Sequence, residues 1–79
     1  MDYSDSMFAS RPQLESMIEV IDLTIRPLRI FQGEQALLAA LQRMKGEVLE
    51  AASSEDHLWV RERITEVFIR HGLGSLAVH

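Results

Sequence analysis

The stretch 37–52, LLAALQRMKGEVLEAA, decides the fold that this sequence predicts. Its apolar residues recur at intervals of four, three and four positions and then continue along the same line: Leu37, Leu41, Met44, Val48, Ala51 and Ala52. This spacing is typical of one face of an α-helix. Only Gly46 interrupts it, either as a weak point that costs about 1 kcal/mol relative to Ala or as the mark of a close helix crossing. We therefore predict a helix from Glu34 to Ala52.

A second amphipathic segment precedes this helix. Ser10 and Gln13 have the spacing of a capping box, and Pro12 lies in the first turn, where its missing N–H costs nothing. The apolar stripe that follows consists of Leu14, Met17, Ile18, Ile21, Ile25 and Leu28. We predict a helix that begins at Ser10 and ends near Gln32, with Gly33 as the residue that stops it.

Pro27 complicates this first helix. Proline removes one backbone hydrogen bond and disfavours helical geometry at Arg26, so we expect a kink or a break there. The segment from Val20 to Ile25 also permits a strand, because apolar residues alternate within it and β-branched residues are dense. The helical period is longer and is capped, and the sequence therefore favours the helix.

A third helix is predicted from about Glu55 to His71. Ser53 and Ser54 supply the turn and the N-cap before it. Its inward face consists of Val60, Ile64, Val67 and Phe68, and Glu66 and Arg70 have the spacing of an i,i+4 ion pair. Gly72 would stop the helix, and Leu73 would make the hydrophobic contact of a Schellman motif. Residues 74–79 form a short apolar tail.

Short connections between three amphipathic helices predict an all-α fold, a small antiparallel three-helix bundle or helical hairpin. Residues 1–9, with their Asp and Ser content, are expected to be a flexible N-terminal arm, and residues 10–79 a single helical domain. The 79-residue length allows one domain at most, and a chain of this size buries only about 60% of its unfolded surface.

Composition narrows the class of protein. Apolar residues make up 47% of the chain and charged residues 25%, which is typical of a globular domain. Cysteine is absent, so no disulfide framework or thiolate metal site is expected, and a cytoplasmic location fits. The acidic start has no signal-peptide pattern, and the longest apolar run, Ala36 to Leu41, is far shorter than a membrane span. The net charge of −4 argues against broad binding to phosphate backbones.

No residue pattern for catalysis, a cofactor or a metal ion is found. His57 and His71 lie about 21 Å apart along one predicted helix, too far apart to share a metal, and His79 is the last residue. The paired carboxylates lack the Glu-x-x-His pattern of di-iron bundles. The serines cluster at predicted caps, and the four glycines form no phosphate loop. We therefore expect the histidines to be structural and the acids to form a solvated face.

The chain has more apolar side chains than one stripe per helix needs. At about 100° per residue, several lie well away from the core line of the first and third helices. They are Val20, Leu23, Ile30 and Phe31 on the first helix and Leu58, Trp59 and Ile69 on the third. In a domain too small for a deep core, such a surplus predicts a second buried surface, with Trp59 and Phe31 as its anchors.

The closing stretch Ile69-Arg70-His71-Gly72 resembles the basic end of some small bacterial secretion chaperones. The general shape, a short acidic chain with surplus apolar helix faces, is also similar to small antiactivator proteins that block a regulator by helix packing. This resemblance implies a helical hairpin that works together with a protein partner. It implies no role for any particular residue.

The predicted function is therefore a non-enzymatic protein–protein interaction module: an adaptor, co-chaperone or regulatory inhibitor. It would form a homodimer or bind a partner helix through the surplus apolar face, with Arg26 and Arg29 at the rim. The alternative is a small helix-turn-helix-like DNA-binding regulator with Ser53–Ser54 in its turn. That alternative needs Arg61, Arg63 and Arg70 on one open face.

Overall fold

In the computed structural model, residues 8–74 are described, and they form three α-helices that run up, down and up. These are α2 (Arg11–Phe31), α3 (Glu34–Ala51) and α4 (His57–Arg70), with a short 3-10 turn, η1 (Ser54–Asp56), before α4. The predicted all-α fold is confirmed. The strand considered for Val20 to Ile25 is not formed, because this segment lies inside α2.

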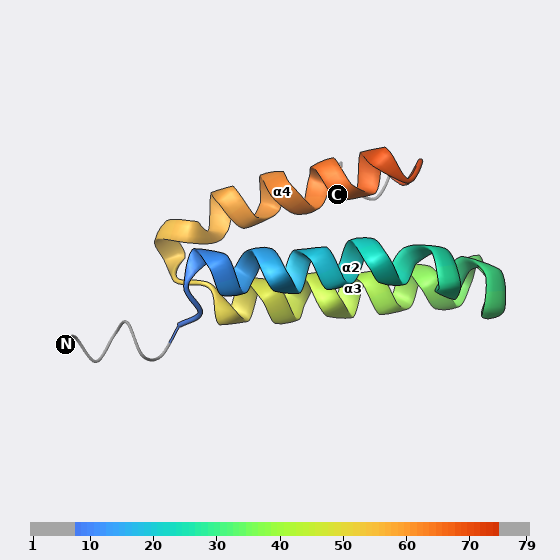
Figure 1. The fold of residues 1–79 in the computed structure, drawn as a ribbon, viewed down its shortest axis with the longest axis horizontal. Helices are drawn as coiled ribbons and strands as arrows, with labels where there is room; N and C mark the ends of the chain where they lie inside the picture. The colour runs from blue at the N-terminus through green and yellow to red at the C-terminus, as the bar shows by residue number, and fades with distance from the viewer. Residues whose placement is uncertain (1–7, 75–79) are drawn as a thin grey trace.

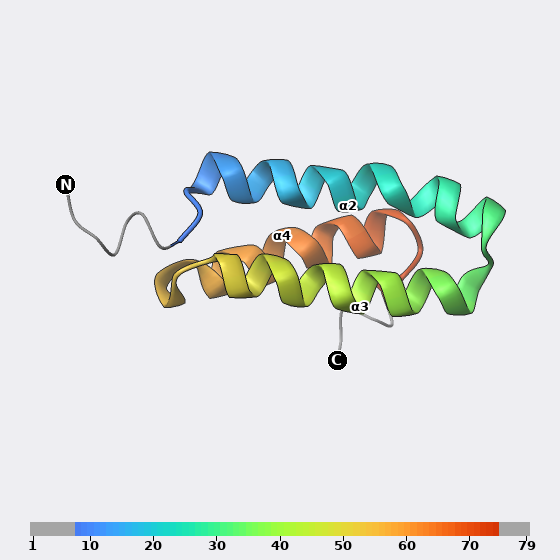
Figure 2. The same ribbon diagram turned by 90° about the horizontal axis from the view of Figure 1, so that it is seen from below.

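The helices form a triangular bundle in which α4 lies along the gap between α2 and α3. Figure 1 shows α4 on one side of the α2–α3 pair, and Figure 2 shows it between the two. The helices α2 and α3 make the most extensive contact and are antiparallel, whereas α2 and α4 run in the same direction. Because α4 is shorter, the end of the hairpin near Gly33 extends past it (Figure 2).

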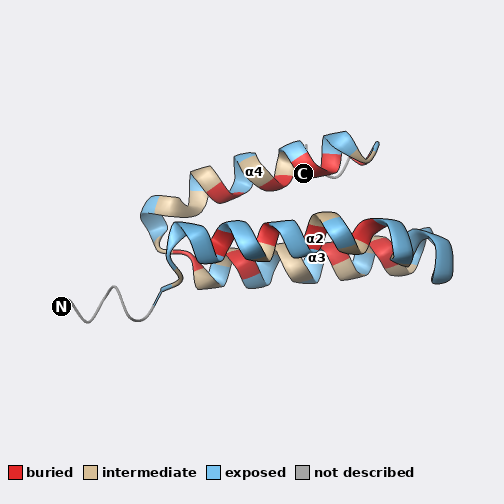
Figure 3. Cartoon of the chain, in the orientation of Figure 1, coloured by how far each residue is buried: buried red, intermediate tan, exposed pale blue. Residues whose placement is uncertain are grey.

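The core is the set of stripes that the sequence predicts. Its buried side chains are Leu14, Ile18, Ile21, Ile25, Leu37, Leu41, Val48, Ala52, Val60, Ile64, Val67, Phe68 and Leu73. Met17, Leu28, Met44 and Ala51 pack against it and are partly buried. Figure 3 shows the buried residues on the surfaces that the helices turn toward one another. Apolar burial at one face of each helix therefore holds the bundle together.

The caps agree with the sequence. Ser10 and Gln13 form a complete capping box at the start of α2. At the end of α4, the Leu73 N–H donates to the Phe68 carbonyl at 2.7 Å and the Gly72 N–H donates to the Ile69 carbonyl at 3.1 Å. This is the Schellman pattern, and Gly72 has the positive φ of 75° that it requires.

The helix α2 is not broken at Pro27, and the structure does not show the kink that was the other expectation. Pro27 and Leu23 are both exposed, so the Leu23 carbonyl that lacks its helical partner lies on the solvent side. On the inner side, Ile25 is fully buried and Leu28 packs against the core. Packing on both sides of the proline therefore keeps the helix continuous.

Gly46 does not mark a close helix crossing. A Cβ built at this position would meet no atom within 4 Å, so α3 simply contains an exposed glycine.

The structure does not describe the two ends of the chain, residues 1–7 of the predicted arm and residues 75–79 of the tail. Within the arm, the Ala9 N–H donates to the Ala51 carbonyl at 2.8 Å and so attaches this part of the arm to α3.

Candidate protein-interaction surface

Four of the seven exposed large apolar side chains in the described chain lie on the outer face of α2. Val20, Leu23, Ile30 and Phe31 are 54%, 68%, 72% and 82% exposed. With Pro27, which is also exposed, they form a line at intervals of three, four, three and one residues. We call these five residues the α2 outer stripe. It faces away from both α3 and α4, and Figure 3 shows this end of α2 largely exposed.

Pro27 was not among the predicted site residues, although it lies at the centre of the stripe. At about 100° per residue from the start of α2, Leu23 lies near about 120° around the helix axis and Val20 near about 180°. Pro27 lies near about 160°, between them, and so belongs to the same face. In the sequence Pro27 stands out as a helix breaker, and its ring was therefore not counted as apolar surface.

A shallow groove opens beside the first residue of the stripe. It has a volume of about 200 Å³ and lies between α2 and α3. Its lining is mostly apolar: Met17, Val20, Ile21, Met44, Glu47 and Val48. Methionine side chains adapt their shape easily, so a groove with two of them suits the insertion of an apolar side chain.

The two arginines predicted for the rim differ in their surroundings. Arg26 is exposed and lies on the edge of the stripe beside Leu23 and Ile30. Arg29 turns the other way, and its Nη2 donates to the His71 carbonyl at 3.1 Å, so it ties α2 to the end of α4. Of the two, Arg26 is therefore better placed to contact a partner at the stripe.

The structure does not bring the predicted residues of α4 onto this surface. Leu58 and Ile69 are 68% and 61% exposed, but they lie on the outer face of α4. Trp59 is partly buried and packs against the core, and the Arg11 guanidinium lies 4.8 Å from its ring centre. The expectation of one patch shared by Phe31 and Trp59 is therefore wrong, because periodicity alone does not show which helix covers which side.

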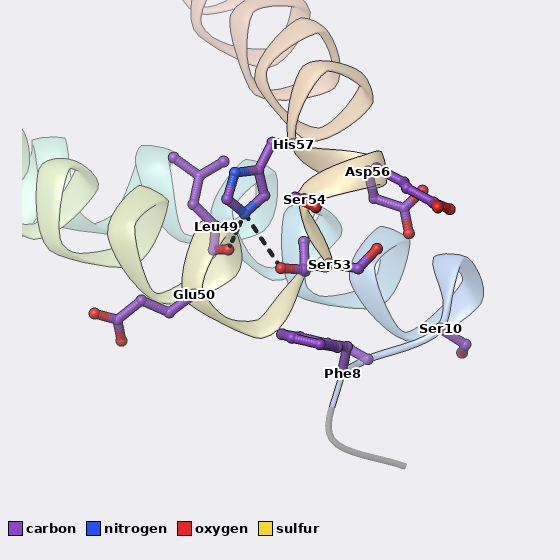
Figure 4. A pocket seen from close by; sticks show the side chains of 11 residues that line it. Phe8, Ser10, Leu49, Glu50, Ser53, Ser54, Asp56 and His57 are labelled. Carbon is purple, nitrogen blue, oxygen red and sulfur yellow. Dashed lines mark hydrogen bonds between the residues drawn. The ribbon is translucent and has the colours of Figure 1, made fainter. Parts of the chain in front are cut away.

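A larger open hollow, about 740 Å³, lies at the opposite end of the bundle (Figure 4). Phe8, Ser10 and residues of the α3–α4 connection line it. His57 Nε2 lies 2.9 Å from the Leu49 carbonyl and 3.2 Å from the Ala52 carbonyl. Carbonyl oxygens only accept hydrogen bonds, so Nε2 carries a proton and donates to the end of α3. The ring thus has the structural role predicted for it.

His71 is also partly buried and hydrogen-bonded. Its Nε2 lies 2.5 Å from Asp22 Oδ1, and Arg70 Nη1 lies 3.2 Å from Asp22 Oδ2. Arg70 therefore pairs with Asp22 on α2. The pair with Glu66 that the i,i+4 spacing predicted is not formed. Glu66 instead accepts from Arg63 at 3.0 Å.

Replacing Asp22 should weaken the contact between α2 and α4 and so destabilise the fold. Asp22→Ala removes the acceptor shared by Arg70 and His71, and hydrogen bonds to charged groups contribute about 1.5–3 kcal/mol each. Because Asp22 keeps 26% of its side-chain surface exposed, solvent screening reduces the effect, and we expect a loss of about 1–2 kcal/mol in unfolding free energy. Urea unfolding measures it. Glu62→Ala, on the exposed face of α4, is the control; equal effects of the two substitutions would contradict the assignment.

The basic residues do not form the open face that DNA binding needs. Arg63 also lies 3.7 Å from Glu15, and with Arg70 it lines the groove between α2 and α4. Arg61 is about 200° around the helix from Arg63, on a different side. Carboxylates from α2 and α4 thus hold two of the three side chains.

Within residues 8–74, no group of three or more His, Asp or Glu side chains is arranged to hold a metal ion. None of the helices in that part of the chain is long and apolar enough to cross a membrane.

No protein-family model, curated protein or solved structure matches this chain. The surface of the molecule is therefore the basis for any functional conclusion.

Proposed function

We propose that this chain is a small non-enzymatic protein–protein interaction module, with the role of an adaptor, co-chaperone or regulatory inhibitor. The observation that supports the proposal is the α2 outer stripe, which leaves Leu23, Ile30 and Phe31 more than 60% exposed along one face of the helix. Contiguous apolar surface of this kind on a small domain marks interaction sites. A helix of the partner would pack along the stripe.

Burial of apolar surface would drive the association. Full burial of one Val, Leu, Ile or Phe side chain contributes about 1.5–3 kcal/mol, so full burial of the four large side chains of the stripe would supply roughly 6–12 kcal/mol. Association itself costs about 4–15 kcal/mol in lost freedom of motion. Because the two terms are of the same order, we expect a reversible complex whose affinity depends strongly on single side chains of the stripe.

Leu23→Asp is expected to abolish this interaction, because a carboxylate at the centre of an apolar contact would be desolvated without a partner. A photo-crosslinking residue in place of Ile30 reports contact in the cells that make the protein. We expect an adduct when the other stripe residues are unchanged, and a loss of about tenfold or more in its yield with Leu23→Asp.

Leu58→Asp is the matched control, since Leu58 and Leu23 are both 68% exposed but lie on different helices. It should leave the adduct unchanged. An adduct at position 30 that survives Leu23→Asp, or one that Leu58→Asp removes equally well, would refute the α2 outer stripe as the contact surface.

A further inference from the structure

The α2 outer stripe carries a protruding side chain at one end and a recess at the other. Phe31, at the end of α2, is 82% exposed. The groove lined by Met17, Val20 and Met44 lies near the other end, eleven or more residues earlier, which is about 16 Å along the helix. At about 100° per residue, Phe31 projects at an angle between those of Val20 and Met17, so both features lie on the same edge of the stripe.

The opposite edge carries two charges of opposite sign. Glu19 and Arg26 are both exposed and stand seven residues apart, which is two helical turns and about 10 Å. Their angular positions differ by only about 20°, so they lie on one line beside Leu23. No ion pair within the described chain involves either side chain: the described carboxylate–cation pairs are made by other residues.

We propose that the occupant of the α2 outer stripe is a second copy of this chain, packed antiparallel around a two-fold axis at Leu23. This deepens the proposed function and rests on it. In an antiparallel symmetric pair, each edge of the stripe faces the same edge of the other copy. Leu23 then meets Leu23 of the second copy, and Val20 lies within one residue of a position directly opposite Pro27 of the second copy.

This single register satisfies both edges. On one edge, Glu19 lies within one residue of a position directly opposite Arg26 of the second copy, and the reverse pair forms by symmetry. On the other edge, Phe31 of the second copy lies two residues, about 3 Å along the helix, from a position directly opposite Met17, near the groove. The protruding ring and the recess therefore complement each other twice, as an isologous interface requires.

A parallel pairing satisfies neither edge. In a parallel symmetric pair each edge faces the opposite edge of the other copy, so Glu19 and Arg26 would face the apolar edge with Val20 and Phe31 and meet no opposite charge. It would also place each Phe31 ring at the height of Phe31 of the other copy, about 16 Å along the helix from both grooves. In the antiparallel arrangement α2 makes most of the contact. Met44 of α3 takes part through the groove, and Glu19 lies where the stripe borders the groove between α2 and α4.

Sedimentation equilibrium of the purified chain over a concentration series tests the proposal. We expect a monomer–dimer equilibrium that Leu23→Asp shifts to monomer and Leu58→Asp leaves unchanged. Glu19→Arg and Arg26→Glu should each weaken the dimer about tenfold, and the double variant should restore it to within about threefold, because the pair is exchanged between copies. Both side chains are exposed, so folding is unaffected and circular dichroism verifies this.

The absence of cysteine allows a direct test of the axis. Leu23→Cys should form an intermolecular disulfide readily under mild oxidation, and Leu58→Cys, equally exposed, should not. Equal crosslinking at the two positions, or a double charge variant as weak as the single ones, would overturn the arrangement. A purified chain that stays monomeric while position 30 still crosslinks to a different protein in cells would overturn the second copy as occupant and leave the proposed function standing.

Discussion

Phe68→Ala is expected to leave most of the protein unfolded at room temperature. Phe68 is the largest fully buried side chain, with 1% of its surface exposed, and it lies on the inner face of α4. Truncating a buried Phe to Ala costs about 3–5 kcal/mol, from lost transfer energy and the cavity that remains. A single core in a domain below about 80 residues rarely supplies more than 3–5 kcal/mol of stability. The loss is therefore as large as the total.

Far-ultraviolet circular dichroism and urea unfolding measure this effect. Ile69→Ala is the control, because Ile69 is the next residue in α4 and is 61% exposed. The control should change the unfolding free energy by less than about 0.5 kcal/mol. A cooperative transition in Phe68→Ala with the same midpoint as the parent chain would show that α4 is not needed for the stability of α2 and α3.

Pro27→Ala is expected to stabilise the protein by about 2 kcal/mol. Proline in a helix interior is about 3 kcal/mol less favourable than alanine, because it lacks the N–H and crowds the carbonyl four residues earlier. Alanine would restore the hydrogen bond to the Leu23 carbonyl inside α2. The unfolded chain gains freedom when proline is removed, which offsets about 0.4–1 kcal/mol of the benefit.

Urea unfolding at low protein concentration, where self-association does not contribute, measures the gain as a higher midpoint with an unchanged slope. Gln42→Ala, an exposed substitution on α3, should shift the free energy by less than about 0.5 kcal/mol. A midpoint that falls in Pro27→Ala would mean that the helix around Pro27 is already adapted to the proline. The stripe would then depend on this residue for its shape as well as its surface.

Most of the fold could be predicted from the sequence, because its signals are local. The period of the stripes identified the buried faces, and Ser10, Gly33 and Gly72 fixed the helix ends within a residue or two. The break considered at Pro27 does not occur, and this has a physical cause. Local propensity counts the lost hydrogen bond but does not count the packing of Ile25 and Leu28 on either side of it.

The candidate site could be predicted only in part, because its residues depend on how the helices are arranged. The exposure of Val20, Leu23 and Phe31 follows from angles within one helix. The separation of Leu58 from them follows from the position of α4 in the bundle, which no spacing encodes. The pairing of Arg70 with Asp22 in preference to Glu66 has the same origin, since the stronger partner lies on another helix.

The order of the helices in the bundle also has a kinetic consequence. The helix α3 packs on α2, which precedes it, and α4 packs about equally on α3 and α2; the connections between consecutive helices are a few residues long. Little loop-closure entropy has to be overcome before these contacts form. Helical bundles with such low contact order reach the native state in microseconds to roughly milliseconds. The molecule therefore belongs among the fast folders, and the apolar residues of its nascent chain are exposed only briefly.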